Sequence, residues 1–187
     1  MAQSRGHLSD EEIVQRVLEG DRESFGILFD RYYFLVFRLA LTKLGDSEMA
    51  QDAAQDAFLR GYNHLDRLRD ASSFGAWMAG ITRNLCRNLR RNMGRRPVSL
   101  EYLAEVGIEP PDPGRPFSLN TDQLAALKRI LPSLPEKYRE ILELRYTEEC
   151  SCKKIASFLD LSLSAVKSRL YHARKLILKR FQKERLE

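Results

Sequence analysis

The sequence predicts an all-α protein of two small helical domains joined by a flexible, proline-rich linker. Apolar residues recur with helical spacing through most of the chain, and no stretch shows the strict alternation of a half-buried strand. Five of the seven prolines fall between Pro97 and Pro116, where regular helix cannot continue. We therefore place a first domain at residues 1–94, a linker at 95–120 and a second domain at 121–187.

Capping and turn residues divide the first domain into helices. Ser9 and Glu12 have the spacing of a capping box. Asp21 can cap a second helix that Gly45 ends, and Asp46 can cap a third. These signals predict helices over residues 10–19, 22–44, 47–62 and 74–92, with a loop at 64–73.

The second domain is predicted to end in a helix-turn-helix. Pro135 suits the start of a helix, because the first-turn amide has no partner there. The last turn contains Asp160 where a glycine is usual, and aspartate tolerates the left-handed conformation better than most residues. Small Ala156 allows a close crossing, Val166 packs into the angle, and Ser164 can cap the final helix. The predicted helices cover residues 122–131, 135–146, 151–159 and 163–184, and a helical turn near 100–106 is compatible with the linker.

Charge and hydropathy narrow the class of protein. No stretch approaches the roughly 20 apolar residues of a membrane helix, and residues 1–10 lack the apolar core of a signal peptide, so we expect a cytoplasmic protein without membrane insertion. The net charge is +5, and the basic residues gather in two places. Residues 82–96 carry six arginines and no acid, and residues 151–187 carry ten Lys or Arg against three acids. Two separate basic clusters indicate two contacts with a polyanion.

Three cysteines, Cys86, Cys150 and Cys152, argue against a disulfide scaffold because their number is odd. Cys150 and Cys152 could form half of a metal or redox site, but no second ligand pair stands at metal spacing. The alternative is two thiols at a helix start in a reducing cytoplasm, and we favour it. We expect no metal and no cofactor.

An acidic stripe marks the third predicted helix. Glu48, Asp52 and Asp56 follow one another at intervals of four, so they share one helix face, with Gln51 and Gln55 beside them. No Lys or Arg falls between residues 46 and 57 to compensate their repulsion. Such a stripe is either an ordinary solvated surface or the contact face for a basic protein partner.

A basic and amide stripe marks the fourth predicted helix. Arg83, Arg87 and Arg91 lie at intervals of four, and Asn84, Asn88 and Asn92 form the adjoining row. Arginine binds phosphate through a bidentate fork and asparagine can pair with base edges, so the stripe suits a nucleic acid. Trp77, on the other side, is equally compatible with a core position and with stacking on an unpaired base.

The final helix has a basic exposed face of the kind that enters a major groove. Its predicted inner positions are Val166, Leu170, Ala173 and Ile177. The predicted outer face carries Lys167, Ser168, Tyr171, His172 and Lys175, with Arg169 and Arg174 at its flanks.

Together these segments resemble the extracytoplasmic-function (ECF) group of bacterial RNA polymerase sigma factors. Residues 21–33 are similar to the opening of sigma region 2, residues 48–58 to its polymerase-binding segment, and residues 74–84 to its promoter-melting and −10 segment. Residues 134–146 are similar to the start of region 4, and residues 166–174 to its −35 reader. The matches fall in both predicted domains, in the family's order.

The resemblance implies a role for each stripe. The factor would bind core RNA polymerase at the clamp helices of the largest subunit and at the flap, bind promoter DNA, and be held by an anti-sigma factor. Polymerase contacts would come from Glu48, Asp52, Gln55, Asp56, Phe58 and Leu59. The −10 contacts would come from His64, Leu65, Asp66, Arg67, Trp77, Arg83, Asn84, Arg87, Asn88 and Arg91, with the loop 64–73 forming a pocket for a flipped base. The −35 contacts would come from Ser164, Lys167, Ser168, Arg169, Tyr171, His172, Arg174 and Lys175.

Other classes explain fewer of these features. A stand-alone helix-turn-helix regulator would bind DNA alone and would give no reason for the acidic stripe or the Arg/Asn stripe. No nucleophile–base constellation, phosphate-cradling glycine loop or metal cluster indicates an enzyme. A helical interaction module would give no reason for two separate surfaces that suit DNA binding.

Overall fold

The computed structural model describes residues 8–93, 126–127, 129–146 and 150–184, and every regular element within these ranges is helical. The predicted linker at 95–120 lies outside them, as do residues 122–125 and 128 of the helix predicted at 122–131. The main helices are α1 (Asp10–Leu18), α2 (Phe25–Leu44), α3 (Ser47–Asn63), α4 (Phe74–Met93), α6 (Glu136–Arg145), α7 (Cys152–Leu159) and α8 (Leu163–Glu184). Within the described ranges they are accompanied by short 3₁₀ turns: η1 (Arg22–Ser24), η2 (Leu65–Arg67), η3 (Ala71–Ser73) and η5 (Leu131–Ser133).

The predicted capping residues begin and end the N-terminal helices. The Ser9 hydroxyl accepts from the Glu12 amide at 3.2 Å, and Glu12 accepts from the Ser9 amide at 2.7 Å, which confirms the capping box. Gly45 takes the left-handed conformation, with φ of 71°, that closes α2. The prediction for Asp21 was wrong in one respect. It caps the turn η1, through the Ser24 amide, and α2 follows that turn directly.

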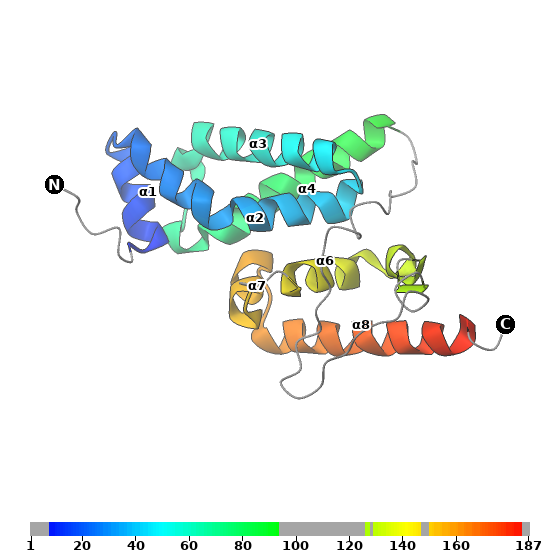
Figure 1. Ribbon diagram of the computed structural model, residues 1–187. Helices are drawn as coiled ribbons and strands as arrows, with labels where there is room; N and C mark the ends of the chain where they lie inside the picture. Colours follow the sequence, from blue (N-terminus) through cyan, green and yellow to red (C-terminus); the bar gives the residue numbers. More distant parts are fainter. Residues whose placement is uncertain (1–7, 94–125, 128, 147–149, 185–187) are drawn as a thin grey trace.

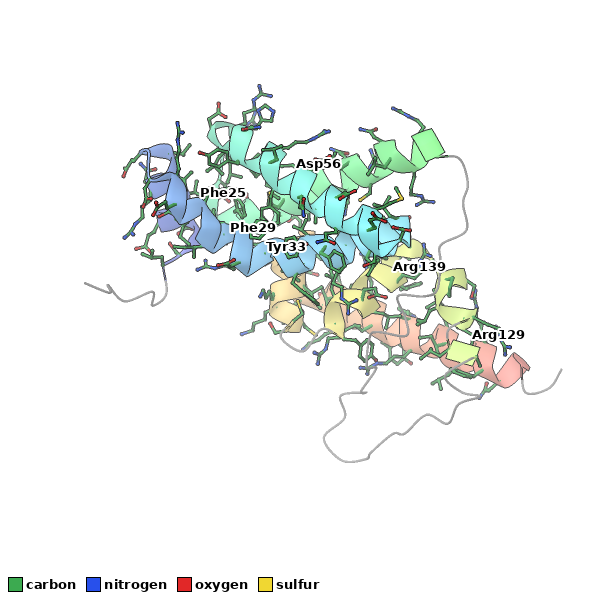
Figure 2. All side chains as sticks on the ribbon, turned by 45° about the horizontal axis from the view of Figure 1, so that its top comes forward. Phe25, Phe29, Tyr33, Asp56, Arg129 and Arg139 are labelled. Carbon is green, nitrogen blue, oxygen red and sulfur yellow. The ribbon has the colours of Figure 1, made fainter. Side chains whose placement is uncertain are left out.

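Helices α1 to α4 form a bundle around α2 (Figure 1). Along α2, Phe25, Phe29 and Tyr33 recur at intervals of four and lie beside α3, where Figure 2 labels them. Their rings surround Phe58 of α3 at centroid distances of 6.4, 4.7 and 6.3 Å. Aromatic edges and faces thus join the two helices, and this packing fixes which side of α3 turns outward.

Helices α6, α7 and α8 form the second helical unit, and α7 and α8 make the predicted helix-turn-helix. Asp160 adopts the left-handed conformation, with φ of 55°, and the Leu161 amide closes the turn on the Ala156 carbonyl at 2.9 Å. The predicted cap was misplaced by two residues. Ser162 caps α8 by accepting from the Ala165 amide at 3.1 Å, whereas Ser164 already lies within the first turn of the helix.

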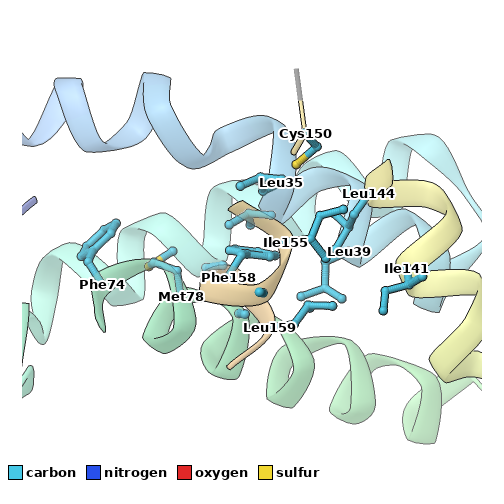
Figure 3. Packing of buried hydrophobic residues seen from close by; sticks show 14 of the residues in the cluster. Leu35, Leu39, Phe74, Met78, Ile141, Leu144, Cys150, Ile155, Phe158 and Leu159 are labelled. Carbon is cyan, nitrogen blue, oxygen red and sulfur yellow. The ribbon is translucent and has the colours of Figure 1, made fainter. Parts of the chain in front are cut away.

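The two units pack against each other, with α6 against α2 and α7 against α4 (Figure 1). Leu35 and Leu39 of α2 belong to the same buried cluster as Ile155 and Phe158 of α7 (Figure 3). The Tyr32 and Phe158 rings lie near-parallel at 6.5 Å. Sequence patterning predicted two apolar cores joined by a tether, whereas in the structure the larger of two buried clusters spans both units.

Candidate functional site

The acidic stripe lies on the outer face of α3. Glu48, Asp52 and Asp56 are exposed, and none of them forms a salt bridge within the described residues. Figure 2 shows Asp56 on this helix, where α3 lies on the outside of the bundle. Because neighbouring carboxylates repel one another, this face favours a cationic partner outside the chain.

Two adjacent residues of α3 have opposite environments. Leu59 is 60% exposed, an unusual degree for a large apolar side chain, and it extends the surface that contains Gln55 and Asp56. Phe58 is 3% exposed and packs among the rings of α2. The structure therefore corrects the expectation that Phe58 contacts the polymerase directly. Its role is to hold the helix from inside.

The Arg/Asn stripe lies on the exposed side of α4. Asn84, Arg87, Asn88 and Arg91 are exposed and Arg83 is half-buried. On the opposite side of the helix Met78 and Cys86 are fully buried and Leu85 is 4% exposed. Within the described residues none of the stripe's arginines forms a salt bridge, whereas Arg90, which lies off the stripe, pairs with Glu136. The packing of α4 thus presents free cations and amides on one face.

A pocket of about 410 Å³ lies next to the loop predicted to capture a base. Leu65 and Asp66 form part of its wall, while His64 and Arg67 are exposed nearby. Leu65 is 3% exposed, so it serves mainly as a core residue beneath the loop. Trp77 is half-buried against Phe74 at 6.2 Å, a position compatible with both roles considered for it.

Part of that pocket comes from residues that the sequence analysis did not select. The end of α1 and the turn after it supply Val17, Leu18 and Arg22, and the end of α3 supplies Tyr62 and Asn63. Leu18 is 50% exposed. Residues more than 40 positions apart meet here, and short-range spacing carries no signal for such a meeting.

The predicted DNA-reading face of α8 is open to solvent. Ser164, Lys167, Ser168, His172, Arg174 and Lys175 are exposed, Arg169 is half-buried, and Tyr171 is 63% exposed. The inner positions Val166, Leu170 and Ala173 are buried and Ile177 is half-buried, as predicted. Tyr171 lies edge-on to His172, with ring centroids 5.5 Å apart. The N-terminal half of α8 therefore presents an exposed cationic and hydrogen-bonding surface.

Two of the three cysteines, Cys86 and Cys150, are buried in environments that suppress thiolate chemistry. Burial raises the pKa of Cys86 to about 11, and burial likewise raises the pKa of Cys150. A neutral thiol is a poor nucleophile and a poor metal ligand. Among the described residues, no group of three His, Cys, Asp or Glu side chains is placed to hold a metal ion.

Family models match both helical units. The model of sigma-70 region 2 matches residues 28–96, and the model of sigma-70 region 4 matches residues 124–177. The "RNA polymerase sigma-H factor" of Pseudomonas aeruginosa is 31% identical over 184 residues, covering 92% of this chain and 94% of the relative. The "ECF RNA polymerase sigma-E factor" of Escherichia coli K12 is 32% identical over 178 residues, covering 91% and 93%.

Solved structures share the fold. CnrH, in complex with the cytosolic domain of CnrY, matches with a TM-score of 0.62 and 24% identity over 93% of this chain and 97% of that one. The sigma factor RpoE of Bartonella quintana, in complex with the anti-sigma factor NepR, matches with a TM-score of 0.53 and 21% identity over 86% and 98%. Within the part of the chain that the structure describes, no helix is both long and apolar enough to cross a membrane.

Proposed function

The chain belongs to the ECF group of RNA polymerase sigma factors, and on that premise we propose which of its surfaces performs each step of promoter recognition. As such a factor it binds core polymerase and directs promoter-specific initiation; it is an initiation factor rather than an enzyme. Its place of action is then the cytoplasm, where polymerase and chromosome are.

The outer face of α3 is the polymerase contact. The observation that carries this assignment is the uncompensated row of Glu48, Asp52 and Asp56, with exposed Leu59 beside it. An apolar anchor within a charged rim is a common arrangement in protein interfaces. The complementary surface would be basic, as the resemblance implies for the clamp helices of the largest subunit.

The exposed side of α4 and the adjoining pocket contact the −10 element. Asn84 and Asn88 can bind base edges, and Arg83, Arg87 and Arg91 can bind phosphates of the separated strand. The pocket beside Asp66 can receive a base rotated out of the stack. Capturing an unstacked base offsets part of the few kcal/mol that unpairing costs, so binding there favours strand opening.

The N-terminal half of α8 contacts the −35 element. Lys167, Tyr171 and His172 are exposed on the surface that would face the groove. A stand-alone regulator could use this helix in the same way. It is not favoured, because it gives no role to the acidic face of α3 or to the stripe on α4.

An anti-sigma protein is the further partner that we propose. The Bartonella RpoE was co-crystallised with the anti-sigma factor NepR, and CnrH was solved in complex with the cytosolic domain of CnrY. Such a regulator would have to cover surfaces needed for transcription, and the exposed faces of α3 and α8 are the candidates.

Run-off transcription with purified core polymerase on a pool of promoters tests the function as a whole. Promoter-specific transcripts that appear only when the protein is added support it, and their sequences give the consensus. Absence of such transcripts, together with specific duplex binding by the protein alone, would favour the stand-alone regulator instead.

A further inference from the structure

Five ionisable side chains form a cluster between α2 of the first unit and α6 of the second. Lys43 Nζ lies 2.7 Å from Glu140 Oε1 and also contacts Glu136. Arg38 Nη1 lies 3.6 Å from Glu143 Oε2. The side chains of Lys43 and Glu140 are each only 9% exposed, and those of Arg38 and Glu143 only 10% and 11%. These contacts, from Arg38 and Lys43 to Glu136, Glu140 and Glu143, are called the α2–α6 clasp below.

The helix ends add to the attraction. Lys43 lies in the last turn of α2, where the helix dipole favours a cation, and Glu136 lies in the first turn of α6, where it favours an anion. The two helices therefore meet at ends of opposite charge. The clasp is complementary both in its side chains and in its backbone.

An apolar contact lies beside the clasp. Phe158 of α7 is 1% exposed, and it packs with Tyr32 of α2 and with the cluster that contains Met78 of α4 (Figure 3). Gly75 leaves room for Tyr32 at the crossing of α2 and α4, since a Cβ there would lie 2.6 Å from the Tyr32 ring. The apolar area favours docking of the two units, and the clasp selects the register in which they dock.

Buried charges make this interface reversible. Ions lose hydration when they enter an interface, and their mutual attraction offsets that cost only in part. When the units separate, all of the clasp residues regain water, so separation leaves no uncompensated buried charge. A fully apolar interface of the same size would open less readily.

The docked arrangement conflicts with simultaneous binding of both promoter elements. Helices α4 and α7 are in contact, and packed helices lie about 8–10 Å apart. The −10 and −35 elements are separated by about 25 base pairs, or about 85 Å of B-form DNA at 3.4 Å per pair. Residues 94–125 could span about 105 Å if extended, which is enough to join the two elements once the units separate.

We propose that the α2–α6 clasp holds the free factor in a closed state, and that its opening precedes simultaneous contact with the −10 and −35 elements. The second part of this inference, the effect of opening on promoter contact, rests on the proposed function. The structural part, a closed state stabilised by the clasp, can be tested without polymerase or DNA.

The first test measures the dimensions of the free full-length chain by small-angle X-ray scattering. A compact chain of 187 residues has a radius of gyration of about 16 Å. We expect Lys43→Glu and, separately, Glu140→Lys to raise it by about 5 Å or more, because each places like charges across the clasp. The double variant Lys43→Glu with Glu140→Lys should recover most of the compaction. Lys179→Glu is an exposed substitution on α8 with the same effect on net charge as Lys43→Glu, and it should leave the radius of gyration unchanged.

Two outcomes separate opening from unfolding. Helix content by circular dichroism should match the wild type in each variant, because Lys43 and Glu140 come from different units and neither completes the core of its own unit. Unchanged dimensions in both single variants, with intact helices, would overturn the closed state. Expansion without recovery in the double variant would overturn the assignment to the clasp.

The second test measures how opening of the clasp affects the formation of open complexes with core polymerase and promoter DNA. The apparent affinity of a factor is reduced by the fraction that is competent to bind, so an opened variant should form open complexes at about tenfold lower concentration than the wild type. If wild type and variants all fail to support specific transcription, the proposed function fails while the closed state stands. If they transcribe with equal concentration dependence although scattering shows opening, the closed state has no role in promoter binding.

Discussion

Helices α3 and α6 each carry three carboxylates along one face, and their surroundings are opposite. Glu136, Glu140 and Glu143 of α6 face cations of α2 and α4, and the side chains of Glu140 and Glu143 are largely withdrawn from water. The stripe of α3 stays exposed and, within the described ranges, unpaired. Both faces have an acidic sequence pattern, so the pattern alone does not distinguish a partner inside the chain from one outside.

The difference teaches how to interpret an uncompensated charge. A charge that meets its counterion inside the fold contributes to the chain's own conformational equilibrium. A charge that the fold leaves unpaired is available to another molecule, where it adds to the rate and specificity of association. By this criterion the carboxylates of α6 stabilise the closed state of the chain, and the carboxylates of α3 are available to bind the polymerase.

The largest effect that we expect separates the inner and outer sides of α3. Phe58→Ala should lower the free energy of unfolding by about 3–5 kcal/mol, because it empties the space between three aromatic rings. Leu59→Ala should change the free energy of unfolding by no more than about 0.5 kcal/mol. It should nevertheless weaken core polymerase binding by about fivefold or more. Urea denaturation measures the free energy of unfolding, and a binding titration measures the affinity for core polymerase. Equal destabilisation by both changes would contradict the assignment of sides.

Charge reversal sharpens the contrast between the two acidic helices. Asp52→Lys with Asp56→Lys should weaken binding to core polymerase by about 100-fold, since it places cations against a basic surface. Glu140→Lys should leave that binding intact or improve it, although it also reverses an acid. Competition with a labelled wild-type factor gives both affinities, and a comparable loss in the two proteins would remove the distinction between α3 and α6.

The same criterion extends to cations. Lys167 and Arg169 of α8 form no salt bridge among the described residues, so each can take a phosphate contact. Replacing both with Ala should reduce the slope of log affinity against log salt by about 1.8 on a −35 duplex. Lys179→Ala, farther along α8, is the matched control. An unchanged slope in the double variant would exclude these residues as phosphate contacts.

The smallest effect concerns the pH dependence of the clasp. Burial alone would raise the pKa of Glu136, but the hydrogen bond from Lys43 and the charges of Lys43, Arg90 and Arg139 outweigh it and hold the pKa below 4.5. A lowered pKa means that its contribution to docking is complete above about pH 4.5 and is lost as the pH falls through the docked-state value.

Scattering measured from pH 7 down to pH 3 should therefore show expansion that begins below about pH 4.5. The Glu136→Gln variant should expand less over the same pH range, because one titrating member of the clasp is gone. Identical profiles for the two proteins would assign the pH dependence to other groups.

Local chemistry in the sequence was sufficient to predict most elements of the fold. The capping box of Ser9, the left-handed residues Gly45 and Asp160, and the inner face of α8 all depend on neighbours within a few positions, and all are where the pattern predicts them. The misplaced cap, Ser162 for Ser164, shows the limit of such reasoning where two serines stand close together. Either can accept a first-turn amide, and the exact start of the helix selects between them.

The sequence by itself determined the all-helical class, the family, and the stripes on α3, α4 and α8, because helical spacing places those residues on common faces. Only the tertiary structure decided that Phe58 packs among three rings of α2 while Leu59 stays 60% exposed, and that α1 supplies a wall of the pocket beside Asp66. Only the tertiary structure joined Lys43 to Glu140, 97 positions away. The physical reason is the same in each case: these outcomes depend on which helix packs against which, and local periodicity does not encode contacts between distant segments.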